Sequence, residues 1–294
     1  MRRSLLVLVV AVAALLGACL PPAPPPSPTT TSLVLHQPVN ATPAPTTPTT
    51  PPTNPAPNPG ANGFDTCAAP SSTTMTSWKH ASPFNVIGVY IGGANKGCAQ
   101  PNLTSGWVGA VVGQGWKLLP LWVGPQASCT ALHGTTKLST DVVTARYQGN
   151  AEANAAANAA VALGLPGPTP IYYDMEAYTR GSTCSGSVQS FSNGWVETLH
   201  ARGYRGAVYS SLCSGVLDLA VSYENPAFAR LDAIWIAAWN DQPNIFGFGP
   251  PCTLGDGYWP SHQRVHQFKG GHNETWGGVQ INIDSNASDG PTYP

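Results

Sequence analysis

The sequence contains few charged residues, and the two signs nearly balance. Only 9% of its 294 residues are Asp, Glu, Lys or Arg, and the formal net charge is -1. A protein that binds nucleic acid or lipid headgroups through its folded surface needs a concentration of basic residues. We therefore expect no nucleic-acid partner, and we expect recognition through neutral polar and aromatic groups.

The common metal and cofactor motifs are also missing. The sequence has no CxxC pair and no HExxH, and no GxGxxG or GxxxxGK[ST] follows the first expected strand. His262 and His266 are four residues apart, but their region has no helical pattern that would place them on one face. Ser210 and Ser211 lack the G-x-S-x-G turn of a nucleophilic serine. We expect no metal and no cofactor.

The N-terminal part of the chain resembles an export signal followed by a spacer. Arg2 and Arg3 precede an apolar run that is too short to span a membrane, and the run ends in Leu-Gly-Ala-Cys, which resembles a bacterial lipobox. We expect a signal peptide over residues 1–18 and lipidation at Cys19; the Arg pair leaves the export route open. Residues 19–61 are expected to form a disordered Pro/Thr-rich linker, because residues 21–60 hold 15 of the 30 prolines and no charged residue.

Residues 62–294 have the length and pattern of one α/β domain. Helical periodicity is clear in the Ala-rich segment 150–163 and in Val188, Phe191, Trp195 and Leu199. Eight short β-type runs alternate with such segments or with Gly-rich ones, at residues 63–67, 86–92, 117–123, 170–176, 206–211, 233–239, 265–268 and 280–284. This alternation predicts a parallel (β/α)8 TIM-type barrel, with room for an incomplete helix ring; a doubly wound open sheet is the alternative.

Four acidic residues are expected to meet at the carboxyl end of this barrel. Asp174 and Glu176 are two apart on the fourth strand, so their side chains share a face. Asp65 and Asp284 occupy the corresponding level of strands one and eight, which are neighbours in a closed barrel. Adjacent carboxyls can differ in pKa, so that one is protonated while the other is ionised. The alternative is that Asp65 and Asp284 only cap loops.

Besides Cys19, six cysteines remain, at or just after the ends of strands one to six. An even number in an exported chain predicts disulfides, although six cysteines allow 15 pairings. Pairing between neighbouring strands would join Cys67 to Cys98, Cys129 to Cys184, and Cys213 to Cys252.

Several short motifs together resemble the family 25 glycoside hydrolases, which are lysozyme-type muramidases. They are Gly63-Phe64-Asp65, Asp174-Met175-Glu176, Trp235 to Trp239, His266-Gln267-Phe268 and Ile283-Asp284. They are more closely similar to the glycoside-hydrolase-like domain of unknown function in actinobacterial exported proteins. Strand seven has His-Gln-Phe where the lysozymes usually have Trp-Gln-Tyr, and the six cysteines also differ from the typical enzyme.

The resemblance implies a barrel that acts on peptidoglycan or a related N-acetylated glycan. By carry-over, Glu176 is the general acid and Asp174 its partner carboxylate, which steers the N-acetyl group or stabilises oxocarbenium charge. Asp65 and Asp284 are supporting acids. The alternative is a catalytically inactive envelope lipoprotein that only binds glycan.

Aromatic side chains on the strands are candidate platforms for sugar rings, since a ring face covers a pyranose. Tyr172 is the preferred candidate because it shares the face of Asp174 and Glu176. The full set of expected substrate-binding residues is Tyr172, Tyr90, Trp122, Tyr209, Trp239 and Gln267, with Trp259 and Trp276 as loop candidates. We expect an exported monomer, held at the outer face of the bacterial cytoplasmic membrane or in the cell envelope, with its lipid anchor as the only membrane contact.

Overall fold

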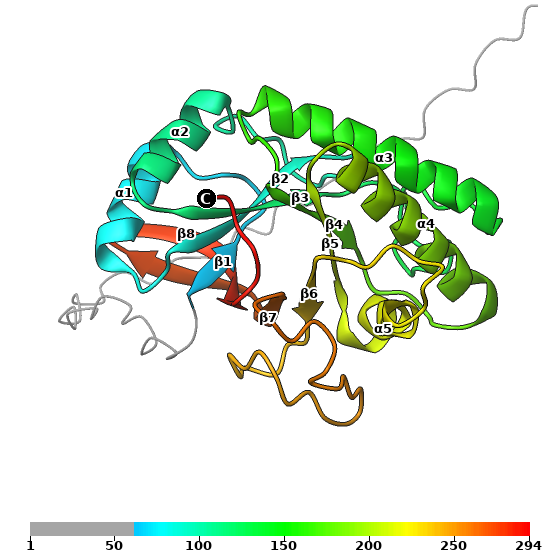
Figure 1. Cartoon of the computed structure of the whole chain (residues 1–294). Helices are drawn as coiled ribbons and strands as arrows, with labels where there is room; N and C mark the ends of the chain where they lie inside the picture. Colours follow the sequence, from blue (N-terminus) through cyan, green and yellow to red (C-terminus); the bar gives the residue numbers. More distant parts are fainter. Residues whose placement is uncertain (1–61) are drawn as a thin grey trace, which may run out of the picture. The chain divides into compact units, whose positions relative to one another are not determined.

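The computed structural model describes residues 62–294, so the predicted signal peptide, Cys19 and the linker lie outside the described residues. Eight strands close into a barrel in chain order (Figure 1). They are β1 (Gly63–Asp65), β2 (Val86–Gly92), β3 (Lys117–Trp122), β4 (Pro170–Met175), β5 (Arg205–Ser211), β6 (Ala233–Ala237), β7 (Arg264–Trp276) and β8 (Val279–Ser288). The predicted barrel is confirmed, and the open sheet is excluded.

One part of the barrel differs from the expected parallel arrangement. Strand β8 runs antiparallel to both of its neighbours, β7 and β1. Strand β7 extends well past the predicted residues 265–268 and turns back through Gly277 and Gly278, whose φ angles are 57° and 78°. Positive φ at both turn positions matches the twist of a tight hairpin, and glycine adopts it without steric strain. A hairpin therefore replaces the last β/α unit.

The helix ring is incomplete. Helices follow the first five strands: α1 (Ser72–Ala81), α2 (Ser105–Gly113), α3 (Val142–Ala162), α4 (Ser182–Ala201), and the π-helical turn η1 (Leu212–Val216) continuing into α5 (Leu217–Tyr223). In the described chain β6 is followed instead by a long loop, residues 238–263, without a helix. Residues of this loop form one wall of a hollow at the carboxyl end of the barrel, which is described below.

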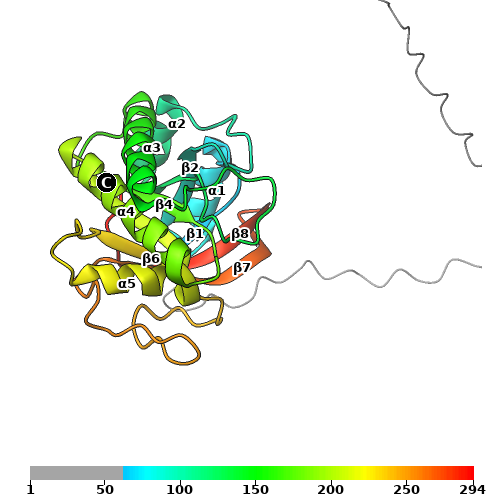
Figure 2. The same cartoon turned by 90° about the vertical axis from the view of Figure 1, so that its right-hand side faces the viewer.

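Helices α3 and α4 lie side by side against the barrel (Figures 1 and 2). Asp141 begins α3 by accepting a hydrogen bond from the Thr144 backbone N–H at 2.8 Å, which satisfies one of the free donors of the first turn. A Cβ at Gly149 would lie 2.1 Å from the Phe191 carbonyl oxygen, so only glycine permits this close approach. The Ala-rich face of α3 is accordingly buried.

The barrel interior is filled by apolar side chains from alternate strand positions. Trp235 lies at its centre and meets the rings of Tyr172 and Tyr209 edge-on, with centroids 5.6 Å apart in each pair. The amino end is closed by the C-terminal segment, where Tyr293 pairs with Leu118. The barrel is therefore a packed core, and only its carboxyl end can hold a site.

The three disulfides join the pairs predicted from neighbouring strands. Their bonds are Cys67–Cys98, Cys129–Cys184 and Cys213–Cys252. Each connects segments that follow adjacent strands at the carboxyl end of the barrel; Cys184 lies in the first turn of α4 and Cys213 in η1. No helix in residues 62–294 has both the length and the hydropathy needed to cross a bilayer.

Candidate active site

The strand-end acids lie where the alternation of β4 predicts. Asp174 is 3% exposed and faces the barrel interior. Tyr173 points outward, and its ring centroid lies 4.6 Å from that of Phe191. Glu176 follows the strand and is partly exposed. The Oδ1 atom of Asp174 is buried and has no hydrogen-bond partner in the protein. Asp174 therefore has one unpartnered carboxylate oxygen close to the partly exposed Glu176.

Asp65 and Asp284 are directly opposite each other on β1 and β8, as predicted. The Gln267 Nε2 donates to Asp65 Oδ2 at 3.1 Å and to Asp284 Oδ2 at 3.4 Å, which holds the two carboxyls close together. Asn286 Nδ2 donates to the same Asp65 oxygen at 2.7 Å, and the Asn286 side-chain oxygen accepts from the Trp235 indole. The sequence reasoning missed Asn286, which is fully buried.

Burial raises the pKa of all four acids, and repulsion from a neighbouring carboxylate adds to the rise at Asp65, Asp174 and Glu176. Burial raises the pKa of Asp65 to about 7; the charge of Asp284 adds to the effect, and hydrogen bonds including that from Asn286 oppose it. Burial also raises the pKa of Asp174 well above its usual value, with help from the charges of Glu176 and Asp65.

Glu176 and Asp284 shift in the same direction. Burial raises the pKa of Glu176, against a hydrogen bond from the Ala177 backbone, and the charge of Asp284 adds to the rise. Burial raises the pKa of Asp284, while His272 opposes it. A partly exposed carboxyl with a raised pKa keeps a larger protonated fraction near neutral pH, as a general acid requires.

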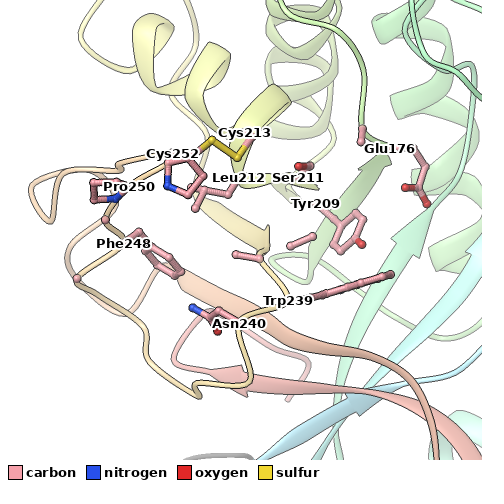
Figure 3. A pocket seen from close by; sticks show the side chains of 16 residues that line it. Glu176, Tyr209, Ser211, Leu212, Cys213, Trp239, Asn240, Phe248, Pro250 and Cys252 are labelled. Carbon is pink, nitrogen blue, oxygen red and sulfur yellow. A yellow bond between two sulfur atoms is a disulfide. The ribbon is translucent and has the colours of Figure 1, made fainter.

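Two hollows open beside these acids, and Glu176 is the one residue that lines both. The first, which we call the acidic hollow, has a volume of about 350 Å³ and is lined by Asp65, Tyr90, Asn95, Asp174, Asn282 and Asp284. The second, the apolar hollow, has a volume of about 580 Å³ and is lined chiefly by Leu212, Trp239, Phe248, Pro250, Pro251 and the Cys213–Cys252 bridge. Figure 3 shows the apolar hollow between Glu176 on one side and Phe248 and Pro250 on the other.

Gln126 fixes the end of β4, and the sequence reasoning missed it. Its Nε2 donates to the Asp174 carbonyl oxygen at 2.8 Å, and its Oε1 accepts from the Glu176 backbone N–H at 2.8 Å. The side chain is 1% exposed. One amide thus sets the backbone on both sides of Met175 and so orients the two acids. The only sequence signal is a lone polar residue in the apolar stretch 123–127.

Gln267 was predicted to bind substrate, and the structure contradicts this. Its Oε1 accepts from the Tyr209 hydroxyl and from the Trp239 Nε1, each at 2.9 Å, and its Nε2 donates to Asp65 and Asp284. A side-chain amide has two N–H groups and two lone pairs on oxygen, so its capacity is used within the protein. Gln267 instead connects Tyr209 and Trp239, which line the apolar hollow, to Asp65 and Asp284 in the acidic hollow.

Two of the predicted sugar platforms are wrong. Tyr172 shares the face of Asp174, but that face lies inside the closed barrel, one layer deeper. It is completely buried, and its hydroxyl donates to the Pro291 carbonyl. Trp122 points out of the barrel and donates to Glu152 on α3. Neither ring has a face for a sugar.

The remaining aromatic candidates divide between surface and core. Tyr90 lines the acidic hollow, and Tyr209 and Trp239 line the apolar one, where Trp239 is 68% exposed. Trp259 is 1% exposed and belongs to the core, so it is excluded. Trp276 lies at the end of β7, not in a loop, and donates to Glu274.

The two histidines considered for zinc are separated by their environments. His266 is buried, with its ring nitrogens bonded to the Asn244 and Ala238 carbonyls, whereas exposed His262 pairs with Asp289. Over residues 62–294 there is no group of three or more His, Cys, Asp or Glu side chains that could hold a metal ion.

Comparison with known proteins shows the family of the chain. The family model described as "Rv2525c-like, glycoside hydrolase-like domain" matches residues 76–288. A search of curated proteins gave no significant match.

Solved structures with the same fold include the Mycobacterium tuberculosis Tat-secreted protein Rv2525c in two complexes. The complex with L-tartrate is 15% identical, covers 80% of this chain and 100% of that one, and has a TM-score of 0.53. The complex with HEPES is 15% identical, covers 80% and 99%, and has a TM-score of 0.51. The modular autolysin LytC of Streptococcus pneumoniae is 14% identical, covers 77% and 46%, and has a TM-score of 0.48, which is too low to carry an argument. Because the family model spans most of the chain, the protein belongs to the family of Rv2525c-like, glycoside hydrolase-like domains.

Proposed function

We propose that this domain is a cell-envelope glycosidase that acts on peptidoglycan or a related N-acetylated glycan. The observation that carries the proposal is the position of Glu176, which lies between two hollows and has a raised pKa. A perturbed carboxyl in a cleft is a recognised indicator of acid catalysis. The family membership supports the same reaction class.

Glu176 donates its proton to the glycosidic oxygen as the bond from that oxygen to the anomeric carbon breaks. Asp174 has a buried oxygen without a partner and is placed to steer the N-acetyl group or to stabilise positive charge on the sugar ring. Asp65 and Asp284 support this charge from the other side of the acidic hollow. Water, or the acetamido group of the substrate followed by water, supplies the new bond to carbon, and a proton from water restores Glu176.

The disulfides and the Tat-secreted relative support export to an oxidising compartment. Lipidation at Cys19 would hold the domain at the outer face of the membrane, and the linker would let it reach the glycan. We propose that it acts there as a monomer.

The test is release of new reducing ends from purified peptidoglycan by the full chain carrying Cys19→Ala. Release that disappears in Glu176→Gln and persists in Glu224→Gln would establish the activity and its acid. Glu224 is the matched control because it is exposed at the end of α5.

Absence of release, with glycan binding equal in the wild type and in Glu176→Gln, would refute cleavage of peptidoglycan. That outcome favours the second candidate, an inactive glycan-binding module. The exposed Trp239 ring, which could stack on a sugar without any chemistry, is the observation in its favour.

A further inference from the structure

The two hollows that meet at Glu176 differ sharply in chemistry. The acidic hollow contributes Asp65, Asp174 and Asp284 with two asparagines and a tyrosine, a set that suits sugar hydroxyls. In the apolar hollow the ionisable side chains are only Glu176 and Tyr209, and the Tyr209 hydroxyl is already bonded to Gln267.

A general acid in a glycosidase protonates the oxygen that joins the sugar to its leaving group. The two sides of Glu176 therefore correspond to the two sides of the bond that is cut. The glycone fits the acidic hollow, where charge develops on the ring. The leaving group then lies in the apolar hollow, past Tyr209 and Trp239 (Figure 3).

We infer that the substrate is an N-acetylated glycoside whose leaving group is apolar, an alkyl or aryl chain such as that of a glycolipid. This inference rests on the proposed glycosidase reaction and differs from it in the leaving group, which in peptidoglycan is a second sugar. A second sugar would bring several hydroxyls against Leu212, Phe248 and Pro250, and besides Glu176 and Tyr209 only Ser211 and Asn240 add side-chain hydroxyl or amide groups to this lining. Hydroxyls that lose water there and find no partner cost binding energy. An apolar chain gains from the same burial.

The wall of this hollow is held in place before any ligand binds. Cys252 is bonded to Cys213, and the Phe248 ring packs edge-on against His266 at 4.8 Å. Arg264, fully buried, donates to the carbonyl oxygens of Ile245, Gly255 and Tyr258, which anchors the loop on both sides of Phe248. A preformed, mostly apolar hollow of this volume is typical of a small-molecule site.

The experiment uses methyl, butyl, hexyl and octyl β-glycosides of N-acetylglucosamine with the full chain carrying Cys19→Ala. We measure kcat/KM for the wild type and the dissociation constant for Glu176→Gln. We expect both to improve with chain length, by about fourfold per added methylene until the hollow is filled. The dissociation constant of n-octanol is measured as a control, because a free alcohol binds through its alkyl chain alone, without the sugar.

Two variants test the wall itself. Leu212→Asn should flatten the dependence on chain length, and so should Gly249→Asp, which is sterically safe because no atom lies within 4 Å of a Cβ at that position. Gly257→Asp is equally free of contacts but lies outside the hollow, so it should leave the dependence intact.

Cleavage of peptidoglycan with no dependence on alkyl length would overturn this inference and leave the proposed function standing. Binding that strengthens with chain length in the absence of any cleavage would refute the proposed glycosidase and leave the inferred site for an apolar chain standing. A graded dependence that survives in both Leu212→Asn and Gly249→Asp would also overturn the inference, as would equal affinity for n-octanol.

Discussion

Replacing Asp65 with Asn should stabilise the protein at neutral pH and leave it almost unchanged at pH 4. Burial raises the pKa of Asp65 from its ordinary value of 3.8 to about 7. Between these values the folded state binds the proton and the unfolded state does not, so the free energy of unfolding falls as pH rises. At 1.36 kcal/mol for each pH unit, this interval corresponds to about 4 kcal/mol. Above pH 7 both states are ionised, and the full penalty applies.

The asparagine should remove this penalty while keeping the local geometry. Its oxygen can accept the bonds that Asn286 and Gln267 donate to Asp65, and its N–H groups can face Asp284. The assay is urea unfolding of both proteins at half-unit steps from pH 4 to 8. We expect the difference in unfolding free energy to grow from near zero to about 4 kcal/mol.

The control is Asp241→Asn, a change of the same chemistry at an exposed loop position, which should alter stability by less than about 0.5 kcal/mol. A difference between Asp65→Asn and wild type that is independent of pH would refute the reasoning. Such a result would mean that Asp65 is ionised throughout this pH range and that burial does not raise its pKa to about 7.

Three further changes test other parts of the site. Gln126→Leu should lower kcat by about 10- to 100-fold with KM changed less than twofold, because the two acids lose a common anchor; a change in KM alone would contradict this. Trp239→Ala should weaken ligand binding about tenfold by calorimetry, whereas Trp239→Phe, which loses the bond to Gln267 and part of the ring area but keeps an aromatic face, should weaken it less; equal losses would contradict a stacking role. Replacing Cys213 and Cys252 with Ser should lower the unfolding free energy by about 4 kcal/mol, from the 39-residue separation that the bridge closes, and an unchanged denaturation midpoint would contradict it.

The barrel could be predicted from the sequence because strand and helix signals alternate along most of the domain. The exception was β7, whose outer half, from Lys269 to Trp276, is polar and half-exposed and therefore resembles a loop. The Gly277-Gly278 pair is the sequence signal for the hairpin turn at the end of this strand. Asp65 and Asp284 are neighbours as predicted, but the end of β1 pairs with the middle of an antiparallel β8 and not with the end of a parallel strand.

The site was predictable to the extent that it follows strand periodicity. Period two placed Asp174 and Tyr172 on one face correctly, but it does not say how deep a residue lies within a closed barrel, so the burial of Tyr172 was missed. Gln126 and Asn286 act through hydrogen bonds to partners far away in the chain. Such contacts leave no periodic pattern, so only the folded structure reveals them.

The three disulfides also bear on the thermodynamics of recognition. They tie the segments at the mouth of the barrel in pairs, so the loops among these segments lose conformational freedom when the bridges form. A ligand that enters later has little loop ordering to drive, and more of its contact energy contributes to affinity. Calorimetry should therefore show a smaller unfavourable conformational entropy of binding for the oxidised protein than for the reduced one. Reduction would then weaken binding without removing a single residue that contacts the ligand.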